Sequence, residues 1–450
     1  SVEISERVFI YGAGAMGNIA KRTIENDNRI QQKVIGFIDN NPSLVGNRID
    51  GIKVYDAEQL ERLLTEMNIE KVIVAIRKPK PELLRALVDV CLSKQVKIQR
   101  VQDPNTWVNG ELTPKKIGKI DISELLGRAH IQLNHERLSA ELHDKTILIT
   151  GAAGSIGSGI TQEVIKYAVR NIILIDQAES ALYDLQQVLI SNEQAKHIHF
   201  CVGDIRNKTA LLELFETHKP DIVFHAAAYK HVPLMEENPQ EAITTNIKGT
   251  KNLTECAIQF QIEKFIFVST DKAVNPTNIM GASKRIAEMI VQHTNDRGIT
   301  KFITTRFGNV LGSRGSVLTS FRDQIEKGGP VTVTHKGVTR YFMTISEAVQ
   351  LVIQAGAIGS NGEVLVLDMG TPVSIYDVAT QVVRNSKKPV AIEIVGLRSG
   401  EKVHEELFAT GEVDTRPHHP LISHVPVKPL SDLTLEDNPK DARDFMIGLV

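Results

Sequence analysis

Near the middle of this 450-residue chain the sequence runs Phe265-Ile-Phe-Val-Ser-Thr-Asp-Lys-Ala-Val-Asn-Pro-Thr-Asn-Ile-Met-Gly-Ala-Ser-Lys284. Its first four residues are apolar and predict a buried strand of a parallel sheet. Four polar residues, 269–272, follow at the carboxyl end of that strand, where doubly wound sheets bind ligands. Met280 and Lys284 come one helical turn apart and therefore on one helix face. The alternative is a surface turn whose aspartate caps the next helix, but the strand position and a glycine-rich loop upstream favour a site.

The composition is that of an ordinary soluble globular protein, with 42% hydrophobic and 24% charged residues. This length predicts two to three domains. A formal net charge of -2 offers no argument for binding nucleic acid or an acidic membrane. Cys91, Cys201 and Cys256 are far apart and lack metal-ligand spacing, which favours buried thiols in a reducing compartment and no metal site.

The N-terminal part predicts a small Rossmann-type domain over residues 1 to about 105. Val8-Phe-Ile-Tyr-Gly-Ala-Gly-Ala-Met-Gly17 is a strand that leads into turn glycines, and the next strand ends in Asp39 at the spacing of a ribose contact. Two interpretations remain: a second nucleotide site, or a structural or regulatory domain that keeps the glycines for a tight turn. We favour the second, because no candidate catalytic group follows. Residues 106–145 are predicted to link this domain to a catalytic domain over 146–450.

A second and stronger glycine-rich pattern is Thr146-Ile-Leu-Ile-Thr-Gly-Ala-Ala-Gly-Ser-Ile-Gly157. Gly151 permits a tight turn, Gly154 lets backbone amides approach a pyrophosphate, and Gly157 lets helix pack on strand. Asp176 ends the following strand, 19 positions after Gly157, where a carboxylate accepts hydrogen bonds from a ribose 2′-hydroxyl. Because no arginine stands beside it, the pattern favours NAD over NADP. The alternative role for Asp176 is to cap a helix.

Further residues of this unit are predicted to contact the dinucleotide. Asp204 closes the third strand, where an aspartate commonly reaches the adenine, and small residues end the fourth strand, where they allow backbone to approach the cofactor or merely pack closely. The remaining predicted cofactor contacts are Ser155, Ile156, Ile205, Ala226 and Ala227.

Taken together, these motifs resemble the extended short-chain dehydrogenase/reductase superfamily, and within it the nucleotide-sugar 4,6-dehydratases of bacterial glycan and polysaccharide biosynthesis. The resemblance covers residues 146 to about 420. The extra N-terminal domain resembles that of the long, membrane-anchored members. This resemblance implies that the chain is the soluble portion of a longer protein at the cytoplasmic face of the membrane. It also implies that the protein is a homo-oligomer. The motifs are Thr150-Gly-Ala-Ala-Gly-Ser-Ile-Gly157, His225-Ala-Ala-Ala-Tyr-Lys-His-Val-Pro233, Ser269-Thr-Asp-Lys-Ala-Val-Asn-Pro276, Asn309-Val-Leu-Gly-Ser-Arg-Gly-Ser316 and Gly396-Leu-Arg-Ser-Gly-Glu-Lys402.

One departure from the superfamily is decisive. Its usual catalytic pair is a tyrosine four residues before a lysine, and the tyrosine takes the alcohol proton. Here Lys284 is present, but Met280 occupies the tyrosine position. Methionine has no titratable proton, so another group must act at the 4-hydroxyl. The long dehydratases are similar to this chain in that substitution.

The resemblance implies a reaction in three stages: oxidation at carbon 4 of the sugar, loss of water across carbons 5 and 6, and return of the hydride to carbon 6. We expect Lys272 to be the base at carbon 5, as a neutral amine, and Asp271 to be the acid for the 6-hydroxyl. Thr270 is expected to relay the 4-hydroxyl proton, through water or Asp271. Lys284 is expected to hold the nicotinamide ribose.

The nucleotide end of the substrate is expected near the C-terminal part. A guanidinium matches phosphate oxygens two at a time, which makes Arg340 and Arg398 the candidates for the pyrophosphate. Thr332 lies on a short alternating strand suited to holding the base ring, Asn309 is placed for a phosphate, and Glu401 for a ribose hydroxyl. Lys230 and Asn246 complete the predicted substrate contacts.

The sequence thus predicts an α/β protein with two Rossmann-type domains and a small C-terminal substrate lobe from about residue 310. The predicted function is an NAD-dependent UDP-N-acetylglucosamine 4,6-dehydratase, with retention at carbon 5 favoured. The alternatives are an inverting dehydratase, a nucleotide-sugar 4-epimerase, and a non-catalytic nucleotide sensor. An epimerase has no task for Asp271 and Lys272, and Met280 removes its usual base.

Overall fold

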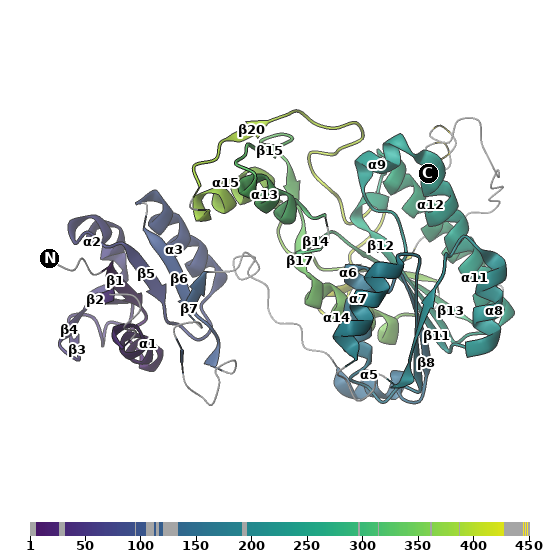
Figure 1. Cartoon of the computed structure of the whole chain (residues 1–450), viewed down its shortest axis with the longest axis horizontal. Coiled ribbons are helices and arrows are strands. Elements are labelled where there is room, and N and C mark those ends of the chain that lie inside the picture. The colour runs from purple at the N-terminus through teal and green to yellow at the C-terminus, as the bar shows by residue number, and fades with distance from the viewer. Residues whose placement is uncertain are drawn as a thin grey trace. The chain divides into compact units, whose positions relative to one another are not determined.

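The computed structural model divides the chain into two compact units, Ser1–Ala129 and His130–Val450 (Figure 1). Both are α/β units built on a mainly parallel sheet, which confirms the predicted fold class. Within the described residues, no helix combines the length and apolarity that a membrane span needs. The structure describes residues 6–26, 32–94, 96–104, 112–113, 117–119, 134–190, 196–295, 298–313, 315–360, 362–386, 388–426, 444, 446 and 448.

The N-terminal unit has a sheet of order β3-β4-β2-β1-β5-β6-β7, parallel except at its two ends. Alternate side chains of β1 point to opposite faces, so Val8 joins the core beneath α1 while Phe9 joins the core beneath α2 and α3. Helices cover both faces, which explains why the central strands β1 and β5 are mostly apolar and buried. The elements are β1 (Glu6–Tyr11), α1 (Ala15–Glu25), β2 (Gln32–Asp39), β3 (Arg48–Ile49), β4 (Ile52–Asp56), α2 (Leu60–Glu66), β5 (Lys71–Val74), α3 (Pro81–Ser93), β6 (Lys97–Val101) and β7 (Ile117–Lys119).

The stretch predicted as a linker, 106–145, is shared between the two units. Strand β7 pairs antiparallel with β6 and so belongs to the N-terminal sheet. Helix α5 (His135–Leu142) buries Leu138 and Leu142 in the core of the second unit. The rest of that stretch, 106–111, 114–116 and 120–133, lies outside the described residues.

The second unit has an eight-stranded sheet of order β10-β9-β8-β11-β12-β13-β18-β21, parallel except for β21. The chain order reverses direction between β8 and β11, which are hydrogen-bonded neighbours. Doubly wound sheets bind ligands outside the carboxyl ends of their strands at such a point. The strands are β8 (Thr146–Thr150), β9 (Asn171–Asp176), β10 (Ile198–Val202), β11 (Ile222–His225), β12 (Lys264–Thr270), β13 (Lys301–Phe307), β18 (Glu363–Leu367) and β21 (Ile422–Pro426).

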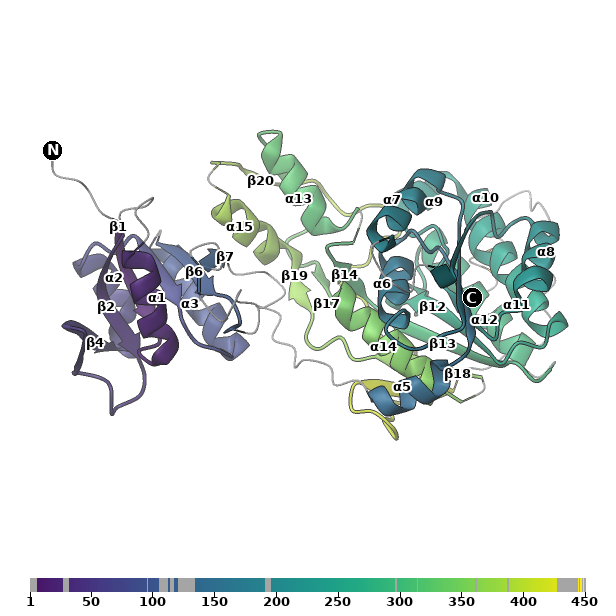
Figure 2. The same ribbon diagram turned by 60° about the horizontal axis from the view of Figure 1, so that its bottom comes forward.

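Helices cover both faces of this sheet (Figures 1 and 2). One face is covered by α6 (Ser155–Val164), α7 (Glu179–Leu189) and α14 (Ile345–Ile358), whose apolar side chains share a core with β8 and β9. The other face is covered by α8 (Lys208–His218), α11 (Thr250–Gln259) and α12 (Ile279–Thr294). These two cores hold the strand ends, and therefore the site, on a rigid base.

The C-terminal lobe, predicted from about residue 310, is built from several segments of the chain. Because α14, β18 and β21 return to the large sheet, the lobe is made of segments that leave it and come back. A capping box between Thr344 and Glu347 starts α14 and marks one return. The lobe's elements are β14 (Asn309–Leu311), α13 (Val317–Glu326), β15 (Val331–Val333), β16 (Thr339–Arg340), β17 (Phe342–Thr344), β19 (Val373–Ser374), α15 (Ile375–Asn385) and β20 (Ile392–Ile394).

Candidate active site

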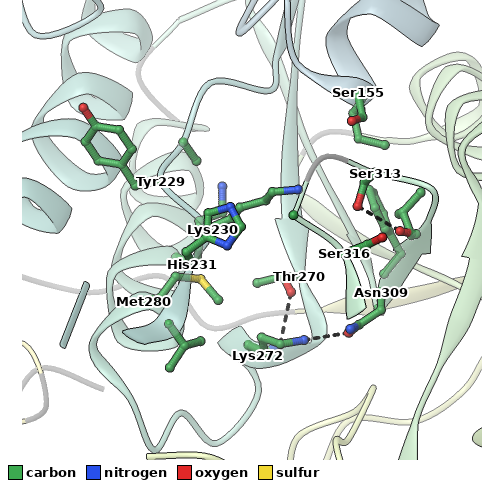
Figure 3. A pocket seen from close by; sticks show the side chains of 18 of the residues that line it. Ser155, Tyr229, Lys230, His231, Thr270, Lys272, Met280, Asn309, Ser313 and Ser316 are labelled. Carbon is green, nitrogen blue, oxygen red and sulfur yellow. Dashed lines mark hydrogen bonds between the residues drawn. The ribbon is translucent and has the colours of Figure 1, made fainter. Parts of the chain in front are cut away.

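A cavity of about 550 Å³ lies at the carboxyl ends of β8, β11, β12 and β13, and residues of the C-terminal lobe complete its wall (Figure 3). This volume is within the range of small-molecule sites. A smaller cavity of about 150 Å³ shares Gly151 and Gly154 with it and extends past the ends of β9 and β10. Together they form a path from the sheet's switch point toward the lobe.

The glycine-rich loop after β8 forms the floor of both cavities. Gly151 has φ +65°, and a Cβ on Gly157 would come within 2.2 Å of the Gly151 carbonyl oxygen, so helix α6 packs directly on the loop. Asp176 fixes this loop, because its Oδ2 accepts a hydrogen bond from Ala153 N at 3.0 Å. Its Oδ1 accepts from Ala178 N at 2.9 Å, just ahead of α7. Asp176 therefore holds two turns and also lines the smaller cavity.

The other predicted cofactor residues line one or other of the two cavities. Asp204, Ile205, Ala226 and Ala227 line the smaller cavity, and Ser155, Ile156 and Gly157 line the larger one. Asp204 pairs with Arg206 at 2.6 Å. Burial acts to raise the pKa of Asp204, but hydrogen bonds and the ion pair with Arg206 outweigh it and lower that pKa. The carboxylate is therefore ionised and has room for a further hydrogen-bond donor.

Lys272 is held at the cavity wall by two oxygen acceptors. It lies in a 3₁₀ turn, η6 (Asp271–Ala273), directly after β12. Its Nζ donates to Asn309 Oδ1 at 2.9 Å, as Figure 3 shows, and to Asp271 Oδ1 at 3.0 Å. Thr270 Oγ1 donates to the same Asp271 oxygen at 2.9 Å. Thr270, Lys272 and Asn309 line the cavity, so their predicted positions in the site agree with the structure.

Asp271, in contrast, does not reach the cavity. Its side chain is 0% exposed, and its Oδ2 finds no hydrogen-bond partner among the described residues. A Cβ on Gly308 would lie 2.8 Å from that oxygen, so the backbone closes over it. The prediction that Asp271 protonates the 6-hydroxyl directly is therefore at odds with its position. In this position the Asp271 carboxylate accepts hydrogen bonds from the side chains of Thr270 and Lys272 and so positions both of them.

Met280 and Lys284 face the cavity from the first turns of α12, as the sequence predicts. Gly281 lets this helix approach closely, because a Cβ there would lie 2.3 Å from the Lys272 carbonyl oxygen. Lys284 Nζ donates to Val268 O at 2.7 Å. Burial lowers the pKa of Lys284 to about 7, while Glu288 acts in the opposite direction.

Two residues predicted to bind substrate lie elsewhere. Asn246 is 1% exposed in the π-helix η5 (Ala242–Gly249), where its amide accepts from Tyr229 N at 2.8 Å and donates to Tyr229 O at 3.0 Å and to Ser283 Oγ at 2.9 Å. It therefore positions the loop that carries Lys230 rather than touching a ligand. Thr332 Oγ1 accepts from Gln324 Nε2 at 2.8 Å and is outside the cavity lining.

Arg340 and Arg398 both line the cavity, but they differ in whether their guanidinium donors are already used in hydrogen bonds within the protein. Arg340 is 7% exposed and its guanidinium donates to Thr339 O, Val403 O and Glu401 Oε1 at 2.8, 3.2 and 3.1 Å. It thus braces the segment that carries Glu401. Arg398 is exposed, and its described contact is made by its backbone N, which donates to Glu401 Oε2 at 3.2 Å. Arg398 is the better placed of the two to bind a phosphate.

The cavity lining also includes residues to which the sequence assigned no definite role. Ser313 and Ser316 line the lobe side of the cavity, and His231 lies beside Lys230 (Figure 3). Burial lowers the pKa of Lys230 below its ordinary value. Glu405 is the most consequential addition. Nothing in the local sequence separates it from Glu406 or Glu412, so only the fold reveals it.

The described residues contain no group of three or more His, Cys, Asp or Glu side chains that could hold a metal ion.

A family model described as polysaccharide biosynthesis protein matches residues 147–427 of this chain. The capsular polysaccharide biosynthesis protein CapD of Staphylococcus aureus is 44% identical over 90% of this chain and 69% of its own length. A UDP-glucose 4-epimerase of Rickettsia rickettsii is 37% identical over 60% of this chain and 79% of its own.

Among solved structures, DesIV of Streptomyces venezuelae, a dTDP-glucose 4,6-dehydratase determined with NAD bound, is similar with a TM-score of 0.53. It is 19% identical, and the match covers 58% of this chain and 88% of that one. At that identity the likeness speaks for the fold.

Proposed function

This chain belongs to the polysaccharide biosynthesis protein family, and from that premise we propose that it is an NAD-dependent nucleotide-sugar 4,6-dehydratase acting on UDP-N-acetylglucosamine. The observation that carries the proposal is the Lys272 amine, held between Asp271 and Asn309 at the cavity wall. A dehydratase needs a base for carbon 5 at this position, whereas exchange of configuration at carbon 4 needs none.

The residues present fit NAD. A pyrophosphate would be bound by the amides at the start of α6, where Gly151, Gly154 and Gly157 line the larger cavity. Asp176 and Asp204 offer carboxylate oxygens in the smaller cavity for the ribose and the adenine. A bound NAD would supply the hydride acceptor for carbon 4 and the hydride donor for carbon 6. Lys284, on the cavity side of α12, is the residue for the nicotinamide ribose.

Thr270 and Asp271 form a path for the proton of the 4-hydroxyl. Thr270 Oγ1 lines the cavity and donates to Asp271 Oδ1 at 2.9 Å. The threonine hydroxyl accepts the sugar proton as it passes its own to the carboxylate, so a buried Asp271 serves as the base without touching the sugar. This relay replaces the missing tyrosine, since Met280 offers no proton site.

The nucleotide diphosphate is bound at the lobe. Arg398 supplies positive charge at the cavity wall, Lys230 adds an amine donor, and Ser313 and Ser316 add hydroxyl donors. The similarity to CapD favours a sugar nucleotide used in capsular polysaccharide synthesis.

The second candidate is a nucleotide-sugar 4-epimerase, which the 37% identity to the Rickettsia rickettsii enzyme favours. Mass spectrometry after incubation with UDP-N-acetylglucosamine separates the two, because a dehydratase product is lighter by one water and an epimer is not. The same incubation with Lys272→Ala is the control. An epimer, or no change at all, would contradict the proposal; no change accompanied by ligand-induced stabilisation would favour a nucleotide sensor.

A further inference from the structure

Glu405 places a carboxyl in the cavity beside the proposed base. It follows the Arg398–Glu401 loop and is only 9% exposed, yet it lines the cavity together with Lys272. Its Oε1 lies 3.9 Å from Lys272 Nζ and 4.0 Å from Arg340 Nε, beyond hydrogen-bond distance from either. The Glu405 carboxyl is therefore available to hydrogen-bond a group that enters the cavity.

The surroundings of Glu405 favour its protonated form. Burial, the largest effect, raises the pKa of the Glu405 carboxyl, and the negative charge of Asp271 raises it further. The positive charges of Lys272, Arg340 and Lys402 lower that pKa, but the net shift is upward. Of the cations, Lys402 Nζ donates to Val274 O at 2.8 Å, and Arg340 donates to Glu401. A carboxyl whose pKa is raised and that faces a cavity is suited to act as a general acid.

We propose that Glu405 is the acid that protonates the departing 6-hydroxyl of the sugar, in the role that the sequence assigned to Asp271. The inference rests on the proposed dehydratase function and names a catalytic residue within it. Elimination across carbons 5 and 6 needs a base and an acid that reach adjacent carbons, and Lys272 and Glu405 form such a pair at the cavity surface.

The elimination balances with these two groups. The Lys272 amine takes the proton of carbon 5, and the electron pair of that C–H bond moves toward the carbon-4 ketone to give an enolate. When the enolate collapses, this electron pair forms the double bond between carbons 5 and 6. The bond from carbon 6 to oxygen breaks, and the Glu405 proton joins the oxygen to give water. Lys272 is then an ammonium and Glu405 a carboxylate, a favourable pair at 3.9 Å. Lys272 later returns its proton to carbon 5. Asp271 has meanwhile gained the 4-hydroxyl proton, which balances the one that Glu405 gave.

The first test compares Glu405→Gln with Asp271→Asn in heavy water, with proton NMR on both the recovered substrate and the product. Without its acid, Glu405→Gln should form the methyl product about a hundredfold or more slowly, while recovered UDP-N-acetylglucosamine still gains deuterium at carbon 5. Asp271→Asn should slow exchange and methyl formation together. The Asp271 carboxylate takes the 4-hydroxyl proton during oxidation and also positions Lys272, so its loss affects both steps. The reverse pattern, with exchange but no methyl in Asp271→Asn and normal turnover in Glu405→Gln, would overturn the proposal.

The second test varies the leaving group, so that a folding defect in Glu405→Gln cannot imitate the result. Fluoride departs with far less need of a proton than hydroxide does. With the 6-deoxy-6-fluoro analogue of the substrate, the defect of Glu405→Gln should shrink to within about tenfold of the natural protein, since proton donation supplies most of the loss. An equal defect with both leaving groups would remove Glu405 from acid catalysis. A natural protein that forms no methyl product at all would instead defeat the proposed function.

Discussion

The Lys284 ammonium group lies over the Phe267 ring, with Nζ 4.0 Å from the ring centroid. The contact is favourable to a cation, yet burial is stronger and lowers the pKa of Lys284 to about 7 from an ordinary value of 10.5. Between these two values the unfolded chain binds a proton that the folded protein has released. The contribution of Lys284 to the free energy of unfolding therefore increases with pH between about 7 and 10.5, and it decreases again as pH falls toward 7.

A Lys284→Met variant removes this titration. Its stability relative to the natural protein should increase as pH falls from about 10 toward 7 and then stay level below 7. Denaturant unfolding of cofactor-free protein at several pH values measures the difference. A difference that does not change with pH would show that Lys284 keeps an ordinary pKa in the fold.

Lys272→Met should abolish both deuterium incorporation at carbon 5 and methyl formation, because no other described amine bonds to Asp271 and Asn309 at the cavity wall. Loss of a general base typically costs about a hundredfold to ten-thousandfold. Lys272→Arg is the matched control, since a guanidinium keeps the charge but does not act as a base at neutral pH. If the arginine variant turned over normally, Lys272 would have only an electrostatic role.

Asp176 and Asp39 make the same bond in their two Rossmann units and allow a matched comparison. Asp176 Oδ2 accepts from Ala153 N at 3.0 Å, and Asp39 Oδ2 accepts from Ala13 N at 2.7 Å. Asp176→Ala should weaken NAD binding about tenfold or more, because it removes a charged acceptor that holds the loop. Asp39→Ala should leave NAD affinity unchanged. Calorimetric titration measures both, and a loss of binding only in Asp39→Ala would place the dinucleotide in the N-terminal unit.

Met280→Leu should keep turnover close to that of the natural protein. Met280 is 3% exposed in an apolar cluster with Ile279 and Ile286, and leucine conserves its volume at a cost below about 1.5 kcal/mol. Steady-state kinetics of methyl formation give the comparison. A severe loss of turnover in a folded variant would mean that the thioether itself takes part.

A buried ion pair beneath the site should be costly to break. Arg306 and Glu288 are both 0% exposed and joined at 2.9 Å, and Glu288 also accepts from Ser269 Oγ at 2.6 Å, next to Thr270. Glu288→Gln leaves the Arg306 charge short of a partner and should destabilise the protein by about 3–5 kcal/mol. The double variant Glu288→Gln/Arg306→Met should recover part of that loss. Chemical denaturation measures each, and additive losses would contradict coupling of the pair.

The sequence was sufficient for the sheet and for the cofactor loop, because both depend on local patterns. Apolar runs, turn glycines and an acid at a fixed spacing placed Gly151 and Asp176 where the structure has them. It was insufficient where a side chain's direction depends on tertiary packing. Asp271 starts a 3₁₀ turn that carries it inward beneath Gly308, and Asn246 turns from the cavity to bond the Tyr229 backbone.

Glu405 is a site residue that the sequence did not predict, because its position also depends on tertiary packing. It comes from a loop more than a hundred residues beyond Lys272 and meets it only through the folding of the lobe onto the sheet. Arg340 has the residue type of a phosphate ligand, but its guanidinium is committed to the carbonyls of Thr339 and Val403. Such commitments are set by three-dimensional neighbours, which spacing along the chain does not encode.

The most direct measurement of the central claim is a proton NMR time course of the protein with UDP-N-acetylglucosamine and NAD in heavy water. A dehydratase that uses Lys272 at carbon 5 predicts a new carbon-6 methyl signal, deuterium at carbon 5, and couplings that report retention or inversion there. A sugar that keeps its carbon-6 hydroxyl and changes only its configuration at carbon 4 would contradict the account and make the protein an epimerase.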